Sequence, residues 1–169
     1  VGDMCVHMFD TVRWMLGRAD RVLALSRESA DEIVAAGVDA RRVATFRYWV
    51  DLACFSPGDK AAARRARGLT SDGVIALFGG RLLEIKGVRR LLAVAQRAEL
   101  RSMTFVFAGV GPLADEVAAA AAADARIVFA GRVSNTDLPA YYRAADVLCV
   151  PSLYAEGYGR VILESLACG

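Results

Sequence analysis

Residues 74–108 read VIALFGGRLLEIKGVRRLLAVAQRAELRSMTFVFA, and this stretch decides the fold. Two short apolar runs, 74–78 and 103–108, enclose a segment at 87–99 whose apolar residues recur with the spacing of one helix face. Strands that are apolar throughout are typical of parallel sheets, because helices cover both of their faces. The stretch therefore predicts a strand, a helix and a second strand parallel to the first.

The same alternation continues towards the end of the chain. Strands are predicted at 127–130 and 147–150, and helices at 113–123, 137–144 and 158–167. Four strand-helix units in series predict a doubly wound, Rossmann-like α/β fold with a parallel sheet and flanking helices.

The first third of the chain has a pattern of its own. Strands are predicted at 21–26 and, more weakly, at 42–46, and Ser26 has the position of an N-cap for a helix that ends near residue 36. The stretch 48–58 contains Pro57 and aromatic residues without periodicity, which indicates a linker. We therefore predict two parts, residues 1–50 and residues 51–169. Because the chain starts with Val and stops at a predicted helix end, we also expect further sequence on both sides.

Composition excludes several classes of protein. Charged residues make up 24% and hydrophobic residues 56%, which is not the composition of a disordered chain. The net charge of +2 is too small to indicate a nucleic-acid partner. The four cysteines show no CxxC spacing and only one histidine accompanies them, so no metal site is predicted. We interpret the cysteines as reduced and expect a cytoplasmic protein.

In a sheet of this kind, ligands bind beyond the carboxyl ends of the strands. The first strand of the 74–108 unit ends in Gly79-Gly80-Arg81, and Lys86 follows before the helix. Arginine offers a planar fork to phosphate oxygens and lysine adds a compact charge, so the pair could neutralise a diphosphate. An exposed loop with ordinary surface charges is the alternative.

A second candidate is the segment 156–164, EGYGRVILE, in which Glu156 and Glu164 are separated by seven residues. The glycines place free backbone N–H groups at the start of a helix, where anions bind readily. Each carboxylate could accept hydrogen bonds from the hydroxyls of a sugar or ribose. The alternative is that Glu156 is a charge at a helix start and Glu164 faces solvent.

A third candidate is the turn Gly109-Val110-Gly111-Pro112. It resembles the start of a dinucleotide-binding fingerprint, but the fingerprint is incomplete because residue 114 is alanine. We interpret it as a tight strand-to-helix turn, whose backbone could still line the cleft.

Taken together, these segments resemble the GT4-type retaining glycosyltransferases of the GT-B fold, also called group 1 glycosyltransferases. The resemblance covers nearly the whole chain. It rests on residues 19–26, on Val50-Asp51 with Phe55-Ser56-Pro57, on Gly80-Arg81 through Lys86-Gly87, on residues 107–112, and on Pro151-Ser152 through Glu164. One departure is Trp49, which stands where the family has glycine. The resemblance implies that residues 51–169 are a truncated C-terminal nucleotide-sugar-binding domain and that residues 1–50 are the end of the N-terminal acceptor domain.

The resemblance also implies roles for individual residues. Arg81 and Lys86 would bind the donor diphosphate, Glu156 the transferred sugar, and Glu164 the ribose diol. Further contacts to the donor would come from Gly80, Gly109, Gly111, Gly157, Tyr158 and Gly159, and Arg132 and Val133 would lie beside the nucleobase.

The reaction implied is transfer of a sugar from a nucleoside-diphosphate sugar to a sugar, lipid or polysaccharide acceptor. Retention at the anomeric carbon is expected, with neither a divalent metal nor a cofactor. The resemblance leaves open a peripheral association with a membrane through the missing acceptor domain, and the fragment alone is expected to be inactive. Two alternatives remain: a sugar-nucleotide epimerase of related fold, and a non-catalytic protein that binds a sugar nucleotide.

Overall fold

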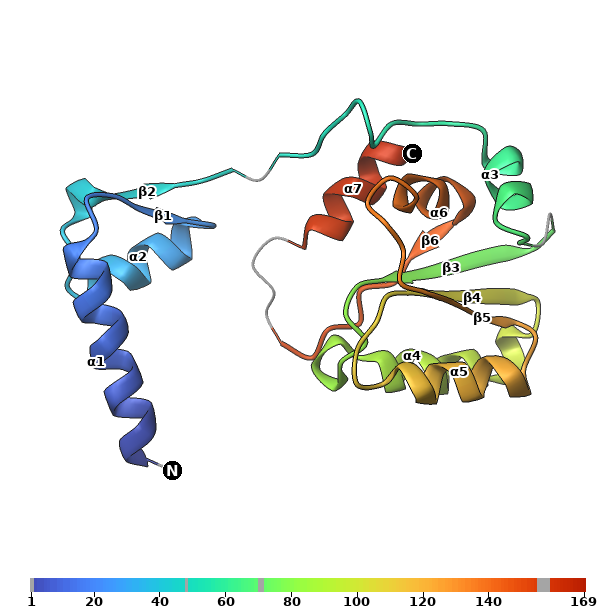
Figure 1. Ribbon diagram of the computed structural model, residues 1–169, viewed down its shortest axis with the longest axis horizontal. Helices are drawn as coiled ribbons and strands as arrows, with labels where there is room; N and C mark the ends of the chain where they lie inside the picture. The colour runs from blue at the N-terminus through green and yellow to red at the C-terminus, as the bar shows by residue number, and fades with distance from the viewer. Residues whose placement is uncertain (1, 48, 70–71, 155–158) are drawn as a thin grey trace. The chain divides into compact units, whose positions relative to one another are not determined.

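The computed structural model describes residues 2–47, 49–69, 72–154 and 159–169 (Figure 1). The chain divides into two compact units, Val1–Trp49 and Val50–Gly169. That the first unit is the end of an acceptor domain stays a prediction.

The first unit is a small α/β unit. It contains α1 (Gly2–Arg18), β1 (Val22–Ala24), α2 (Arg27–Ala35), the short turn η1 (Ala40–Arg42) and β2 (Val43–Thr45). The two strands pair in parallel, with Val22 opposite Val43. Ser26 caps α2 as predicted, since its hydroxyl accepts a hydrogen bond of 3.1 Å from the N–H of Ser29.

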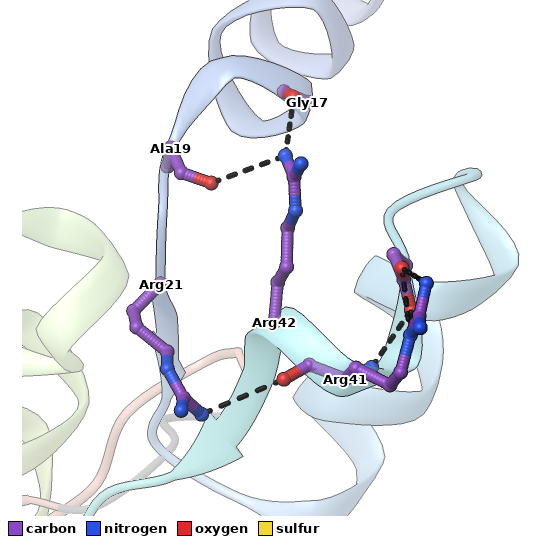
Figure 2. A network of polar contacts seen from close by, with 6 residues as sticks. Gly17, Ala19, Arg21, Arg41 and Arg42 are labelled. Atoms are coloured by element: carbon purple, nitrogen blue, oxygen red, sulfur yellow. Dashed lines mark hydrogen bonds and ion pairs between the residues drawn. The ribbon is translucent and has the colours of Figure 1, made fainter.

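Arg42 joins the end of α1 to β2, as Figure 2 shows. Its Nη1 donates to the carbonyl oxygens of Gly17 at 3.0 Å and Ala19 at 3.5 Å. The last carbonyls of a helix have no partner within the helix, and a cation is favourable at that end. Arg21 adds a longer contact of 3.5 Å to the carbonyl of Arg41. The end of α1 is therefore held by side chains that reach backbone oxygens.

The second unit confirms the predicted Rossmann-like α/β fold. Its four strands are parallel and lie in the order β5-β4-β3-β6. Their bounds are β3 (Val74–Gly79), β4 (Met103–Ala108), β5 (Ile127–Gly131) and β6 (Val147–Leu148). The helices are α3 (Lys60–Ala66), α4 (Val88–Ala95), α5 (Ala114–Ala123), α6 (Leu138–Ala144) and α7 (Arg160–Cys168), with short 3-10 turns η2 (Glu84–Lys86) and η3 (Ala98–Leu100). In Figure 1, α4 and α5 lie on one face of the sheet, and α6 and α7 on the other.

Some boundaries differ from the predicted ones. The helix expected over 87–99 ends at Ala95, and a separate turn, η3, follows it. The strand expected over 147–150 is only two residues long, although the N–H of Cys149 still donates to the carbonyl of Leu77 at 2.7 Å. Pro151 comes two residues later and has no N–H with which to continue the ladder.

The core consists of two clusters, one on each face of the sheet. Ala76 and Phe78 of β3 belong to the cluster under α4 and α5, whereas Ile75 and Leu77 belong to the cluster that includes residues of α6 and α7. All four are at most 3% exposed. Successive side chains of a strand point to opposite faces, so an unbroken apolar run fills both clusters.

A polar network fastens α3 to the sheet. Asp146 accepts from Arg64 Nη2 at 2.5 Å, from Lys60 Nζ at 2.8 Å and from the N–H of Ile75 at 2.8 Å. The side chain of Arg64 is only 8% exposed, and its Nε also donates to the carbonyl of Ala144. Partial burial acts to raise the pKa of Asp146, but the hydrogen bonds from Lys60 and Ile75 and the charge of Arg64 outweigh it and lower that pKa.

Candidate functional site

A pocket of about 460 Å³ lies at the carboxyl ends of β3, β4 and β5, where ligands bind in sheets of this kind. Its volume falls within the range of small-molecule sites. One side is formed by the strand ends and the segments after them, namely Gly79, Gly80, Arg81, Ala108, Gly109, Val110, Arg132, Val133 and Asn135. The other side is formed by α6 and α7, with Leu138, Arg160, Val161 and Glu164.

Two turns are fastened together along one edge of the pocket. The N–H of Gly80 donates to the carbonyl of Ala108 at 2.9 Å, and the N–H of Leu82 donates to the carbonyl of Val110 at 3.0 Å. A Cβ on Gly109 would lie 1.7 Å from the carbonyl oxygen of Gly80. Glycine at 109 is therefore required because two stretches of backbone approach each other closely.

Gly111 has a similar structural role. A Cβ at this position would lie 2.5 Å from the carbonyl oxygen of Leu82, and Gly111 is not among the residues that line the pocket. The tight turn predicted at 109–112 is thus present, and its second glycine packs against the neighbouring turn.

The two cationic side chains that were predicted to bind phosphate, Arg81 and Lys86, differ in their positions. Arg81 is exposed and lines the pocket. Lys86 lies in η2 and is not part of the lining; its Nζ donates to the hydroxyl of Tyr154 at 2.8 Å.

Glu164 is buried at the side of the pocket, so the alternative that it faces solvent is wrong. It is 5% exposed, and it lies four residues after the start of α7 at Arg160, about one helical turn into the helix. Tyr142 of α6 donates its hydroxyl to Glu164 Oε2 at 2.9 Å, and Arg160 Nη2 lies 3.2 Å from Oε1. Each carboxylate oxygen therefore has one hydrogen-bond donor from the described part of the protein.

The contact between Tyr142 and Glu164 joins two helices through a buried polar pair. Tyr142 is 4% exposed. Burial raises the pKa of the Tyr142 phenol well above its usual range, and the adjacent charge of Glu164 adds to the shift. The phenol therefore keeps its proton and remains a hydrogen-bond donor.

The segment after β5 supplies the remaining polar lining. Arg132 and Val133 line the pocket, as do Asn135 and Leu138, which the sequence analysis did not identify. Arg160 and Val161 were also missed. Arg160 could have been found from its spacing, since residues four apart lie on the same face of a helix and Arg160 precedes Glu164 by four.

Part of the predicted site lies outside the described residues: Glu156, Gly157 and Tyr158. Gly159 is described and is the N-cap of α7. Within the described ranges, no group of three or more His, Cys, Asp or Glu side chains could hold a metal ion. Over the same ranges, no helix is long and apolar enough to cross a membrane.

Comparison with known proteins gives the family. The family model for glycosyl transferases group 1 matches residues 73–169, which is more than half of the chain and includes every residue of the pocket. The chain belongs to this family. Membership agrees with the resemblance drawn from the sequence.

Curated relatives of this group 1 glycosyltransferase are similar over most of its length. A D-inositol 3-phosphate glycosyltransferase of Kribbella flavida is 37% identical in an alignment that covers 89% of this chain and 39% of the relative. The protein of that name from Mycobacterium tuberculosis is 35% identical over 92% of this chain and 34% of its own length. The chain thus spans little more than a third of these curated relatives.

Solved structures show the same fold. Anabaena HepE in complex with UDP-glucose has a TM-score of 0.78 at 23% identity, covering 95% of this chain and 46% of HepE. Sucrose-phosphate synthase from Thermosynechococcus elongatus has a TM-score of 0.80 at 26% identity, covering 97% of this chain and 42% of the synthase. The group 1 glycosyltransferase therefore has the α/β architecture of the GT-B glycosyltransferases, as expected.

Proposed function

We propose that this chain supplies the donor site of a GT4-type enzyme that transfers a sugar from a nucleoside-diphosphate sugar. One observation carries the proposal: Arg81, Arg132 and the buried Glu164 line a single pocket. Guanidinium groups suit phosphate oxygens, and a carboxylate suits a diol. A nucleoside diphosphate contains both groups.

Within this function, Arg81 neutralises the diphosphate and stabilises it as a leaving group. Lys86 assists when it turns from Tyr154 towards the phosphates. Glu164 accepts hydrogen bonds from the ribose hydroxyls, and Arg132 and Val133 lie beside the base. Glu156, outside the described residues, holds hydroxyls of the transferred sugar.

We further propose that the configuration at the anomeric carbon is retained and that no divalent metal takes part. The bond from the anomeric carbon to the diphosphate oxygen breaks and its electron pair stays with the diphosphate, the acceptor oxygen bonds to that carbon, and the proton of the acceptor hydroxyl passes to the departing nucleoside diphosphate. Cationic side chains and the N-terminus of α7 take the place of a metal as counter-charge for the diphosphate. We place this reaction in the cytoplasm.

The relatives suggest which substrates to test first. HepE was crystallised with UDP and with UDP-glucose, which favours UDP-sugars as donors. The names of the curated relatives make D-inositol 3-phosphate the first acceptor for a panel.

The test uses the complete reading frame that contains this sequence, assayed with UDP-, GDP- and ADP-sugars and a panel of acceptors. We expect a glycosylated product with the anomeric configuration of the donor. An epimerised sugar nucleotide without acceptor product would support the epimerase alternative. Nucleotide binding without transfer or hydrolysis would support the non-catalytic one.

A further inference from the structure

We propose that Tyr142 is a positioning residue for the donor site and acts by fixing the carboxylate of Glu164. Tyr142 does not line the pocket, so it acts on a ligand only through Glu164. The inference rests on the proposed function, in which Glu164 holds the ribose hydroxyls.

The hydroxyl of Tyr142 lies immediately behind the pocket wall. It donates to Glu164 Oε2 at 2.9 Å. A Cβ built on Gly79, which lines the pocket, would lie 3.7 Å from the same hydroxyl oxygen. The tyrosine hydroxyl therefore lies close both to the pocket lining at Gly79 and to the carboxylate of Glu164.

The tyrosine ring is itself held in place. It packs against the ring of Phe55, with centroids 6.1 Å apart, inside the cluster that also contains Ile75 and Leu77. The raised pKa of the phenol, caused first by burial and then by the charge of Glu164, keeps the proton on Tyr142. A fixed donor of this kind allows the carboxylate only a narrow range of orientations.

The number of acceptor sites suits a diol. An ionised carboxylate has about four lone-pair sites on its two oxygens. Tyr142 uses one site on Oε2, and Arg160 uses one on Oε1. Counting the donors among the described residues, each oxygen thus keeps one site, and two neighbouring hydroxyls can each donate to one oxygen.

The test compares Tyr142→Phe with the unaltered protein, using UDP, GDP and ADP together with the 2′,3′-dideoxy form of each. Calorimetry gives the dissociation constants. For the ribonucleotide that binds, we expect the affinity to fall about tenfold, as for loss of one hydrogen bond to a charged group. We expect the affinity for its dideoxy form to stay within about twofold, because no ribose hydroxyls remain for Glu164 to hold.

Tyr141→Phe is the matched control. Tyr141 is the preceding residue on the same helix, and its ring lies against the guanidinium of Arg67, 5.1 Å from the ring centroid. This variant should bind both forms as the unaltered protein does.

Two results would overturn the inference. Equal losses for the ribonucleotide and its dideoxy form would show that Tyr142 merely supports the fold, and an unchanged ribonucleotide affinity would show that it does not position Glu164. If the unaltered protein binds none of the three nucleotides, the proposed function fails first and the inference falls with it.

Tyr142→Phe could unfold because it removes a donor from the buried carboxylate of Glu164, and a second comparison tests the inference in that case. The double variant Tyr142→Phe/Glu164→Ala is compared with Glu164→Ala alone. We expect equal ribonucleotide affinities, since Tyr142 acts only through Glu164. A further loss of several-fold in the double variant would overturn the inference.

Discussion

Gly109→Ala tests the close approach of the two turns beside the pocket. The new Cβ would lie 1.7 Å from the carbonyl oxygen of Gly80, so the two turns would have to separate by more than about 1 Å to reach an ordinary contact distance. That movement would break the hydrogen bonds from Gly80 to Ala108 and from Leu82 to Val110, each of which contributes about 1 kcal/mol. With about 1–3 kcal/mol for overpacking, the expected loss in the free energy of unfolding is about 3–5 kcal/mol.

Gly68→Ala is the matched control. Gly68 also has a positive φ, of 63°, but a Cβ there would meet nothing within 4 Å. The Gly68→Ala variant should then lose only about 1–2 kcal/mol in the free energy of unfolding, the penalty for a residue with a Cβ in the left-handed backbone region. Urea unfolding followed by circular dichroism should separate the two variants by roughly 1 M in midpoint, given a slope of about 2 kcal/mol/M. Equal midpoints would refute the close approach of the turns.

The other predictions concern stability and chemistry. Asp146→Asn should lower the free energy of unfolding, measured in urea, by about 3 kcal/mol, because the buried guanidinium of Arg64 would lose its negatively charged partner. The pKa of Asp146 is lowered from 3.8, so its contribution is complete above about pH 4 and disappears as the pH falls through the folded-state pKa. Acid titrations should therefore show a smaller loss of stability in the Asn variant than in the unaltered protein. In the complete enzyme, Glu164→Ala should weaken binding of the nucleoside-diphosphate product by about 1–3 kcal/mol in calorimetry. Glu156→Ala should leave that affinity nearly unchanged and lower the turnover in initial-rate assays; an inverted result would exchange the two roles. Transfer should survive EDTA, and activity lost on chelation but restored by magnesium or manganese would contradict a metal-free mechanism.

The fold was predictable because its strands are apolar throughout. Side chains of β3 fill both core clusters, so a run such as 74–78 could belong only to a sheet covered on both faces. Strand and helix ends were less predictable. The two-residue length of β6 depends on its pairing with β3, and α4 ends at Ala95, four residues before the predicted end at 99.

The lining of the pocket was predictable where it follows directly from strand ends. Gly80, Gly109, Arg132 and Val133 each lie within two residues of the end of a strand, and all four line the pocket. Contacts between distant elements were not predictable. Nothing in the sequence near Tyr142 indicates that its hydroxyl reaches Glu164, twenty-two residues later.

Under the proposed function, the burial of Glu164 links the stability of the second unit to the binding of a donor. A buried carboxylate is costly unless donors compensate it. Tyr142 and Arg160 supply donors from within the protein, and the ribose hydroxyls would supply two more from the pocket side. A bound nucleotide would thus complete the hydrogen bonding of a group that already joins α6 to α7. Ligand binding would then stabilise the unit against unfolding in proportion to ligand concentration. This stabilisation by ligand would be smallest in Glu164→Ala, which lacks the carboxylate to which the ribose hydroxyls would donate.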